Sequence, residues 1–264
     1  MDIFQTIILG LVQGLTEFLP ISSSAHLVFI PKFSGMEDQG LAFDVVLHFG
    51  TLCAIVYYYR CSLLSMSKSF FNSLQTRNLE GEAGLAWAVL LGTIPVGLAG
   101  IYFKDSISLN LRSVEVIAFA TIFFGLLLGF SDWLHRRLDR VRDVIRVSDV
   151  VIVGCFQVLA LIPGTSRSGI TITAALLVGL SRQMSIKFSF LLAIPVIALA
   201  TLVKMLDLVN ESAEVDWLLL ALGFCISAIT AYATVVFFIR LVDRIGFMPF
   251  VVYRILLGAL LLLL

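Results

Sequence analysis

The sequence predicts an all-α polytopic membrane protein made of two repeats with inverted topology. Three observations lead to this fold class: an apolar composition, apolar segments of membrane-spanning length, and a polar motif present in both halves. Of 264 residues, 59% are hydrophobic and 14% are charged, and the mean hydropathy is +1.03. A soluble domain is roughly 45–50% apolar and about 25% charged. A chain in lipid must satisfy its own backbone polar groups, which helices do.

Two apolar stretches, 6–32 and 150–182, are interrupted by Pro20 or Pro163 and by polar residues. Each half of such a stretch has ~10–15 residues, too short to cross a hydrocarbon core of ~30 Å. We therefore expect each stretch to form a re-entrant helix hairpin whose loop lies inside the membrane. Full spans of about 20 residues are predicted after each hairpin. They are 41–60, 86–104 and 113–133 in the first half (1–149), and 186–206, 216–240 and 247–264 in the second half (150–264).

The two halves resemble each other in sequence. Residues 10–15 (GLVQGL) align with residues 154–159 (GCFQVL), and Pro20 and Ser23 then align with Pro163 and Ser166. Three spans follow each hairpin, and three is odd, so the second half must be inverted relative to the first. Inverted repeats place binding sites near the midplane, where the repeats meet.

Basic residues predict the orientation. Five arginines fall within 134–148 and favour the cytoplasm for that loop. Both termini then lie outside, the first hairpin enters from the outer face, and the active site opens to the outer, periplasmic face. The N-terminus lacks the basic region of a cleaved signal peptide, so we interpret it as mature structure. The four cysteines have no metal-ligand spacing and are interpreted as packing residues.

The first hairpin carries acid–base chemistry. Gln13 and Glu17 are four residues apart and share a helix face. Pro20 ends that helix, and one of the serines 22–24 can cap the next, which places His26 in its first turn. Glu17 could act as a general base or as a ligand of a hard divalent cation.

The second hairpin carries groups suited to an anion. Pro163-Gly164 breaks the helix, Thr165 or Ser166 caps the next one, Arg167-Ser168 opens it, and Thr171 lies one turn on. Two helix N-termini would converge, and their N–H groups and dipoles favour an anion. The Arg167 guanidinium suits phosphate oxygens.

Four other interpretations are structural. Glu17 and Arg167 could form a purely structural ion pair. His48 is expected to be a packed, hydrogen-bonded core residue, and His135, in the basic loop, to be solvated. Arg254 is expected to snorkel to the cytoplasmic interface or to form a structural pair.

At these motifs the chain resembles a known family. Gln13-x-x-x-Glu17, then Leu19-Pro20-x-Ser22-Ser23 and His26, resembles the first signature of bacterial undecaprenyl pyrophosphate phosphatases of the bacitracin-resistance type. Residues 163–171, Pro-Gly-x-Ser-Arg-Ser-x-x-Thr, resemble the second. The resemblance covers nearly the whole chain. The family has Glu or Gln at the first motif position, and Gln13 here puts a two-carboxylate metal site in doubt.

The resemblance implies an integral membrane hydrolase of the bacterial inner membrane. It would release phosphate from undecaprenyl pyrophosphate, recycle the lipid carrier for peptidoglycan and cell-wall synthesis, and confer bacitracin resistance. It would depend on a divalent cation, Mg²⁺ or Ca²⁺, and a homodimer is left open. The matching residues are divided among three expected roles. Catalysis is expected from Glu17, Ser23, His26 and Arg167, phosphate binding from Ser22, Ser166, Arg167, Ser168 and Thr171, and metal binding from Glu17 and Gln13.

Ser23 is the leading nucleophile, with His26 or Glu17 as its base, while an attacking His26 or a metal-activated water stays open. The alternative function is a lipid-phosphate transporter or flippase that uses the same inverted-repeat site. A carrier needs binding groups but neither nucleophile nor base, so Ser23, His26 and Glu17 together favour an enzyme.

Overall fold

The computed structural model describes residues 2–34, 40–77, 81–111, 113–137, 141–209 and 216–263. Within these ranges it is almost entirely helical, with one isolated bridge between Arg142 and Leu180. This confirms the all-α class. The elements are α1 Ile3–Thr16, α2 Ser23–Ser34, α3 Gly40–Tyr58, α4 Arg60–Thr76, α5 Glu82–Asn110, α6 Val114–His135, α7 Val147–Val158, the 3₁₀ turn η1 Leu159–Leu161, α8 Arg167–Leu177, α9 Arg182–Val209, α10 Trp217–Ile245 and α11 Met248–Leu261.

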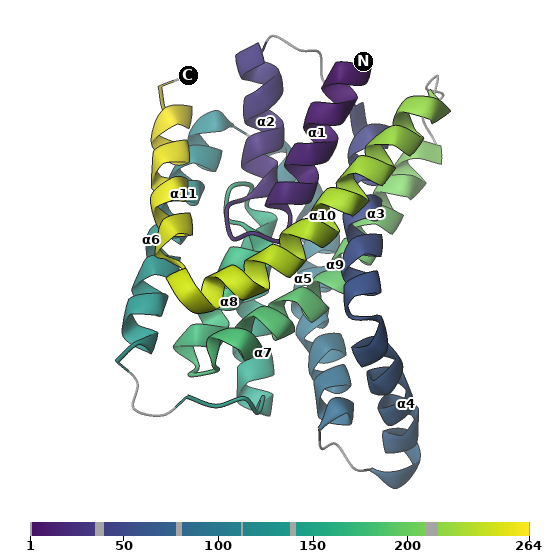
Figure 1. Cartoon of the computed structure of the whole chain (residues 1–264), viewed down its shortest axis with the longest axis vertical. Coiled ribbons are helices and arrows are strands. Elements are labelled where there is room, and N and C mark those ends of the chain that lie inside the picture. Colours follow the sequence, from purple (N-terminus) through teal and green to yellow (C-terminus); the bar gives the residue numbers. More distant parts are fainter. Residues whose placement is uncertain are drawn as a thin grey trace.

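Several of these helices are long and apolar enough to cross a membrane. Glu82–Phe103, Val114–His135, Arg182–Leu206 and Trp217–Ile245 meet both criteria, and α3 with α4 forms a further candidate bent by 75°. The protein is therefore a multi-pass membrane protein. Figure 1 shows these helices running roughly along the long axis, with both termini at the end opposite α4.

The two interrupted segments form short helices joined by loops. α1 and α2 have 14 and 12 residues, and α7 and α8 have 12 and 11. At ~1.5 Å per residue none of them can cross a bilayer alone. Figure 1 shows α1 and α2 entering from the end that carries the termini, while α7 and α8 occupy the other half of the molecule.

Four helices differ from the prediction. Residues 60–76, expected as a loop, form the polar helix α4 after a bend at Tyr59. α9 begins at Arg182 and α10 ends at Ile245, so both helices extend beyond the predicted spans into polar residues. α11 has 14 residues instead of the expected 18-residue span: it begins at Met248, after the turn at Gly246, whose φ is +69°, and it ends at Leu261.

Small residues set the spacing around α10, the helix that crosses the front of the molecule in Figure 1. A Cβ on Gly14 of α1 would lie 2.6 Å from Thr230 Cβ, and one on Gly50 of α3 would lie 2.1 Å from Ser227 Oγ. Glycine allows the backbones to approach closely, as is typical of membrane helix interfaces. α1 and α3 are therefore both seated directly on α10.

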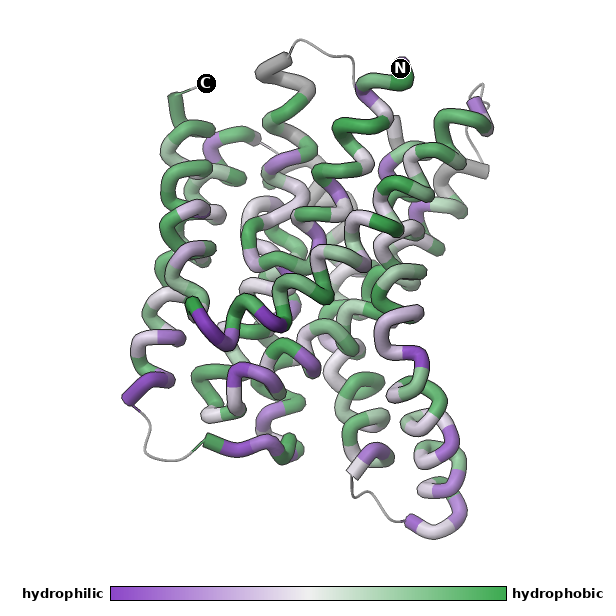
Figure 2. Tube along the Cα trace, viewed as in Figure 1, coloured by the Kyte–Doolittle hydropathy of each residue, from purple (hydrophilic) through white to green (hydrophobic). Residues whose placement is uncertain are grey.

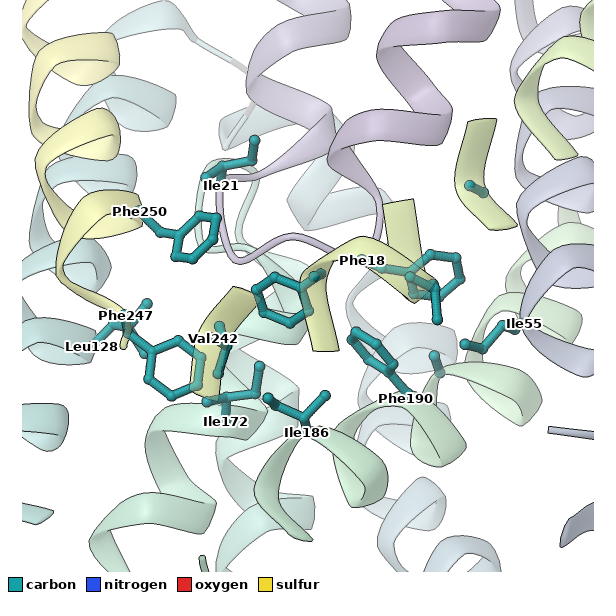
Figure 3. Close-up of a cluster of buried hydrophobic side chains, with 14 of the residues drawn as sticks. Phe18, Ile21, Ile55, Leu128, Ile172, Ile186, Phe190, Val242, Phe247 and Phe250 are labelled. Atoms are coloured by element: carbon teal, nitrogen blue, oxygen red, sulfur yellow. The ribbon is translucent and has the colours of Figure 1, made fainter. Parts of the chain in front are cut away.

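Aromatic and aliphatic side chains fill the centre of the molecule beneath the first loop (Figure 3). Phe18 and Ile21, from that loop, join Phe190 of α9 and Phe250 of α11 in one buried cluster. Phe18 and Phe190 are 5.3 Å apart in an edge-to-face arrangement. In Figure 2, hydrophilic residues are frequent along α4 and in the half of the molecule that contains it, while hydrophobic residues predominate along most of the other helices.

Candidate active site

The first loop brings a hydroxyl group onto a carboxylate. Ser23 Oγ donates to Glu17 Oε2 at 2.8 Å, and Gln13 Nε2 donates to the same oxygen at 3.1 Å. α1 ends at Thr16, and Phe18, which follows Glu17, is fully buried in the core and anchors the loop. A carboxylate in this position could act as the base for a serine nucleophile.

Both helices that leave the loops start from serines in an unusual backbone conformation. Ser22, before α2, has φ +72°, and Ser166, before α8, has φ +69°. Such values cost non-glycine residues energy and are concentrated at functional sites. Ser166 Oγ caps α8 by accepting from Gly169 N at 3.2 Å. This resolves the choice between Thr165 and Ser166 in favour of Ser166.

The two loops contact each other directly. Arg167 Nη2 lies 3.5 Å from Glu17 Oε1, Ser168 Oγ donates to the carbonyl of Leu19 at 3.0 Å, and Gly164 N donates to Ser24 Oγ at 3.3 Å. The side chains of Glu17 and Arg167 are only 8% and 10% exposed. The Ser23 hydroxyl, the Glu17 carboxylate and the Arg167 guanidinium thus form one group, in which Glu17 and Arg167 are 150 positions apart in the sequence.

The start of α8 is suited to a phosphate group. The N–H groups of Arg167 and Ser168 have no hydrogen-bond partner within the described part of the chain. Free N–H groups at a helix N-terminus attract anions. Arg167 donates to the carbonyl of Ser189 on α9 at 3.3 Å, and this hydrogen bond orients the Arg167 side chain.

Thr171 lies one turn below Arg167, as predicted. Its hydroxyl contacts the Arg167 carbonyl at 2.8 Å, the Ser168 carbonyl at 3.2 Å and Ser189 Oγ at 2.6 Å. These contacts tie α8 to α9. In this arrangement Thr171 supports Arg167, and Ser189, which no motif in the sequence indicates, is its partner.

His26 lies beside the site, but it is not hydrogen-bonded to Ser23. Its Nδ1 is 2.8 Å from the carbonyl of Ser22, and its Nε2 is 2.6 Å from the hydroxyl of Tyr253. A carbonyl can only accept, so Nδ1 carries the proton, and in the neutral ring Nε2 accepts from Tyr253. Glu17, not His26, is therefore the hydrogen-bonded partner of Ser23.

Two histidines outside the motifs are placed differently from each other. His48 donates from Nδ1 to the carbonyl of Asp44 at 2.7 Å, as expected of a hydrogen-bonded helix residue, and its Nε2 lies 3.9 Å from Glu17 Oε2. His135 was expected to be solvated, and this is wrong: it is 8% exposed. The reason is that nearby Asp132 binds Arg182 of α9 at 2.6 Å and closes this end of α6.

Arg254 also differs from its prediction. It is fully buried, and no carboxylate lies within 4.0 Å of its guanidinium in the described ranges, so it neither snorkels nor forms an ion pair. It donates instead to the carbonyls of Thr121, Pro20, Gly164 and Thr165. Nothing in the sequence around Arg254 indicates these contacts, because the carbonyl groups belong to distant parts of the chain.

The donor set accommodates a hard cation in part. Across the described residues, no group of three or more His, Cys, Asp or Glu side chains is arranged to hold a metal. Glu17 supplies one carboxylate, and the fully buried Gln13 has an Oε1 atom without a partner. Mg²⁺ is commonly held by one or two carboxylates plus substrate phosphate oxygens, so these two side chains fit a cation that arrives with a phosphate.

Comparison with known proteins places the chain in a family. A profile described as "Bacitracin resistance protein BacA" matches residues 6–260. An undecaprenyl-diphosphatase of Ruthia magnifica subsp. Calyptogena magnifica is 56% identical over 258 residues, covering 98% of this chain and 97% of the relative. Undecaprenyl-diphosphatase 2 of Stutzerimonas stutzeri (strain A1501) is 54% identical over 266 residues, covering 100% of this chain and 98% of the relative. One of Nitrosococcus oceani is 52% identical over 261 residues, covering 99% and 98%. The match over nearly the whole length shows that this chain belongs to the bacitracin resistance protein BacA family.

Proposed function

We propose that this membrane enzyme hydrolyses undecaprenyl pyrophosphate to undecaprenyl phosphate and inorganic phosphate. Relatives at 52–56% identity carry the name undecaprenyl-diphosphatase. The observation that carries the proposal is the group formed by Ser23, Glu17 and Arg167, in which Ser23 Oγ is 2.8 Å from the carboxylate and Arg167 is 3.5 Å from it. It combines a nucleophile, a base and a phosphate-binding cation.

The geometry supports a two-step reaction. Ser23 Oγ attacks the terminal phosphorus while its proton passes to Glu17, and the bond from that phosphorus to the bridging oxygen breaks, releasing undecaprenyl phosphate. Glu17 passes that proton to the departing phosphate oxygen. Water then attacks the phosphorus of the phosphoserine and gives its proton to Glu17, the bond from phosphorus to Ser23 Oγ breaks, Glu17 returns the proton to Oγ, and inorganic phosphate leaves. Arg167 and the N–H groups at the start of α8 hold the phosphate oxygens throughout.

His26 and Thr171 support the reacting groups. The bonds of His26 to Ser22 and Tyr253 fix α2, and therefore Ser23, against α11. Ser22, Ser166 and Ser168 shape the two loops that receive the phosphates. A divalent cation, Mg²⁺ or Ca²⁺, held by Glu17 and Gln13 together with the substrate, would neutralise phosphate charge.

The proposed setting is the bacterial inner membrane, with the site open to the periplasmic face and both termini outside. Two observations support this. The termini lie at the end opposite α4 (Figure 1), and basic residues are concentrated at the α4 end, where loops would face the cytoplasm. Regenerating the lipid carrier there would sustain peptidoglycan synthesis and confer bacitracin resistance.

The test is phosphate release by purified protein. With undecaprenyl pyrophosphate in detergent and Mg²⁺ or Ca²⁺ present, we expect one phosphate per substrate from the wild-type chain and background release from Glu17→Gln. A transporter would move lipid phosphate across liposomes without releasing phosphate. Absence of phosphate release from folded wild-type protein with either cation would contradict the proposal.

A further inference from the structure

Arg254, in the last helix, is a buried cation without a carboxylate. It has no exposed surface. A charged side chain inside the membrane is costly and is retained where it has a partner or a role. Its partners here are carbonyl oxygens from three separate elements, so its role concerns the backbone.

The contacts of Arg254 join both loops to α6. Nε donates to the Thr121 carbonyl at 3.0 Å, and Nη1 to the Pro20 carbonyl at 3.4 Å. Nη2 donates to the carbonyls of Gly164 and Thr165 at 3.0 and 2.8 Å. One guanidinium therefore holds the break in the first hairpin and the break in the second in a fixed relation.

Glycines on the neighbouring helices leave room for the Arg254 side chain. A Cβ on Gly169, in the first turn of α8, would lie 2.8 Å from Arg254 Nη1 and 3.2 Å from Ser166 Oγ. A Cβ on Gly125 of α6 would lie 3.0 Å from Arg254 Cβ. The guanidinium is thus packed against the N-terminal turn of α8, directly behind its capping serine.

This position determines where the α8 amides point. The C=O and N–H of a trans peptide point in opposite directions. With the Thr165 carbonyl drawn toward Arg254, the N–H of Ser166 is turned to the opposite side, and Ser166 is the N-cap of the helix that carries the N–H groups of Arg167 and Ser168. The same residue leaves the site with surplus positive charge, because Glu17 balances Arg167 and no carboxylate balances Arg254.

We propose that Arg254 is a positioning residue for the phosphate site. It holds the two loops in fixed positions relative to each other, and it supplies the positive charge that the diphosphate neutralises. The inference rests on the proposed function. It predicts two separable effects: charge at this position governs anion affinity, and the fork of N–H groups governs turnover.

The experiment compares Arg254→Lys with Arg254→Met in purified protein. Turnover and KM are measured with undecaprenyl pyrophosphate, and binding of methylenediphosphonate, which cannot be hydrolysed, is measured calorimetrically. In Arg254→Met, we expect methylenediphosphonate affinity to fall about tenfold or more, with a raised KM. Arg254→Lys keeps the charge and should bind nearly as wild type, but with kcat reduced about tenfold or more.

Gly125→Ala is the second variant, because it displaces the Arg254 stem without removing its charge. It should lower kcat and leave methylenediphosphonate affinity unchanged. The exposed Arg244→Met, at the end of α10, is the matched control for loss of a positive charge.

Two results would overturn the proposal. One is wild-type affinity and kcat in Arg254→Met. The other is equal loss of affinity in the Lys and Met variants, in proportion to a fall in thermal stability and with Gly125→Ala unaffected, which would mark a merely structural residue. Failure of the proposed function is a different outcome, in which wild-type protein binds methylenediphosphonate but releases no phosphate.

Discussion

Ser23 is the proposed nucleophile, and its position makes a specific prediction. Its hydroxyl donates to Glu17 Oε2. It makes no hydrogen bond with His26, which lies three positions further along the sequence. Removal of a nucleophile slows the chemical step by orders of magnitude and leaves ground-state binding in place. We expect Ser23→Ala to bind methylenediphosphonate as wild type while phosphate release falls by ~10³ or more.

The control for Ser23→Ala is Ser65→Ala, an exposed serine on α4 that should retain full activity. Substantial turnover in Ser23→Ala would exclude the serine nucleophile. In that case a water near Glu17 takes the role, and Glu17→Gln should still be inactive.

Arg167 makes the second prediction at this scale. Its guanidinium reaches both Glu17 Oε1 and the Ser189 carbonyl, so its planar fork is used in two directions. Lysine keeps the charge but cannot donate in this fixed geometry. Arg167→Lys should lose both phosphate affinity and turnover, by about tenfold or more each. The exposed Arg244→Lys serves as control, and wild-type kinetics in Arg167→Lys would remove Arg167 from the site.

Among the elements, the interrupted helices could be predicted from sequence, and an ion pair between Glu17 and Arg167 was one of the expected interpretations, whereas most other contacts between the helices could not be predicted. Pro20 and Pro163, with polar residues after them, mark the breaks because proline and hydroxyls interrupt an apolar helix. Partners such as Ser189 and Tyr253 come from other helices, and only the packed fold brings them to Thr171 and His26.

Two element-scale errors have physical causes. α4 was not predicted from the sequence, because hydropathy identifies apolar spans, whereas α4 is a polar helix. A single residue, Tyr59, separates it from α3. His135 was expected in solvent because its neighbours in sequence are arginines. Asp132, which is fully buried, pairs with Arg136 and Arg182 and draws that turn into the protein.

The seating of α1 on α10 makes a prediction about a glycine. A Cβ at Gly14 would lie 2.6 Å from Thr230 Cβ and 2.8 Å from the Ser227 carbonyl, so backbone must move to admit it. Gly14→Ala should therefore destabilise the protein by about 1–3 kcal/mol, the usual cost of overpacking. It should also shift Glu17, at the end of α1, and reduce activity.

Gly97→Ala on α5 is the matched control, because its nearest neighbour, Leu199 Cδ1, would be 3.9 Å away. The measurement is thermal unfolding in detergent alongside phosphate release. Equal melting temperatures and activities for the two alanine variants would show that the close approach of α1 and α10 does not matter.

On the scale of the whole molecule, the orientation in the membrane decides which face receives substrate. Positive charge is distributed unevenly: Arg60 and Lys68 of α4, the arginines at the end of α6 and those of the 141–146 segment belong to elements in the half of the molecule away from both termini (Figure 1). Loops rich in Lys and Arg stay in the cytoplasm during insertion. The first hairpin, whose loop carries Ser23 and Glu17, then opens toward the periplasm.

Single cysteines in a cysteine-free background test this orientation. Cys53, Cys61, Cys155 and Cys225 are unpaired and are replaced first by alanine. Ser148, at the start of α7, and Leu263, which is 84% exposed near the C-terminus, lie at opposite ends of the fold and are then replaced by cysteine. A membrane-impermeant maleimide added to intact spheroplasts should label Leu263→Cys at once and Ser148→Cys only after the membrane is opened. The reverse pattern would turn the protein over in the membrane, so that Ser23 and Glu17 face substrate arriving from the cytoplasm, while the chemistry proposed for them would stand.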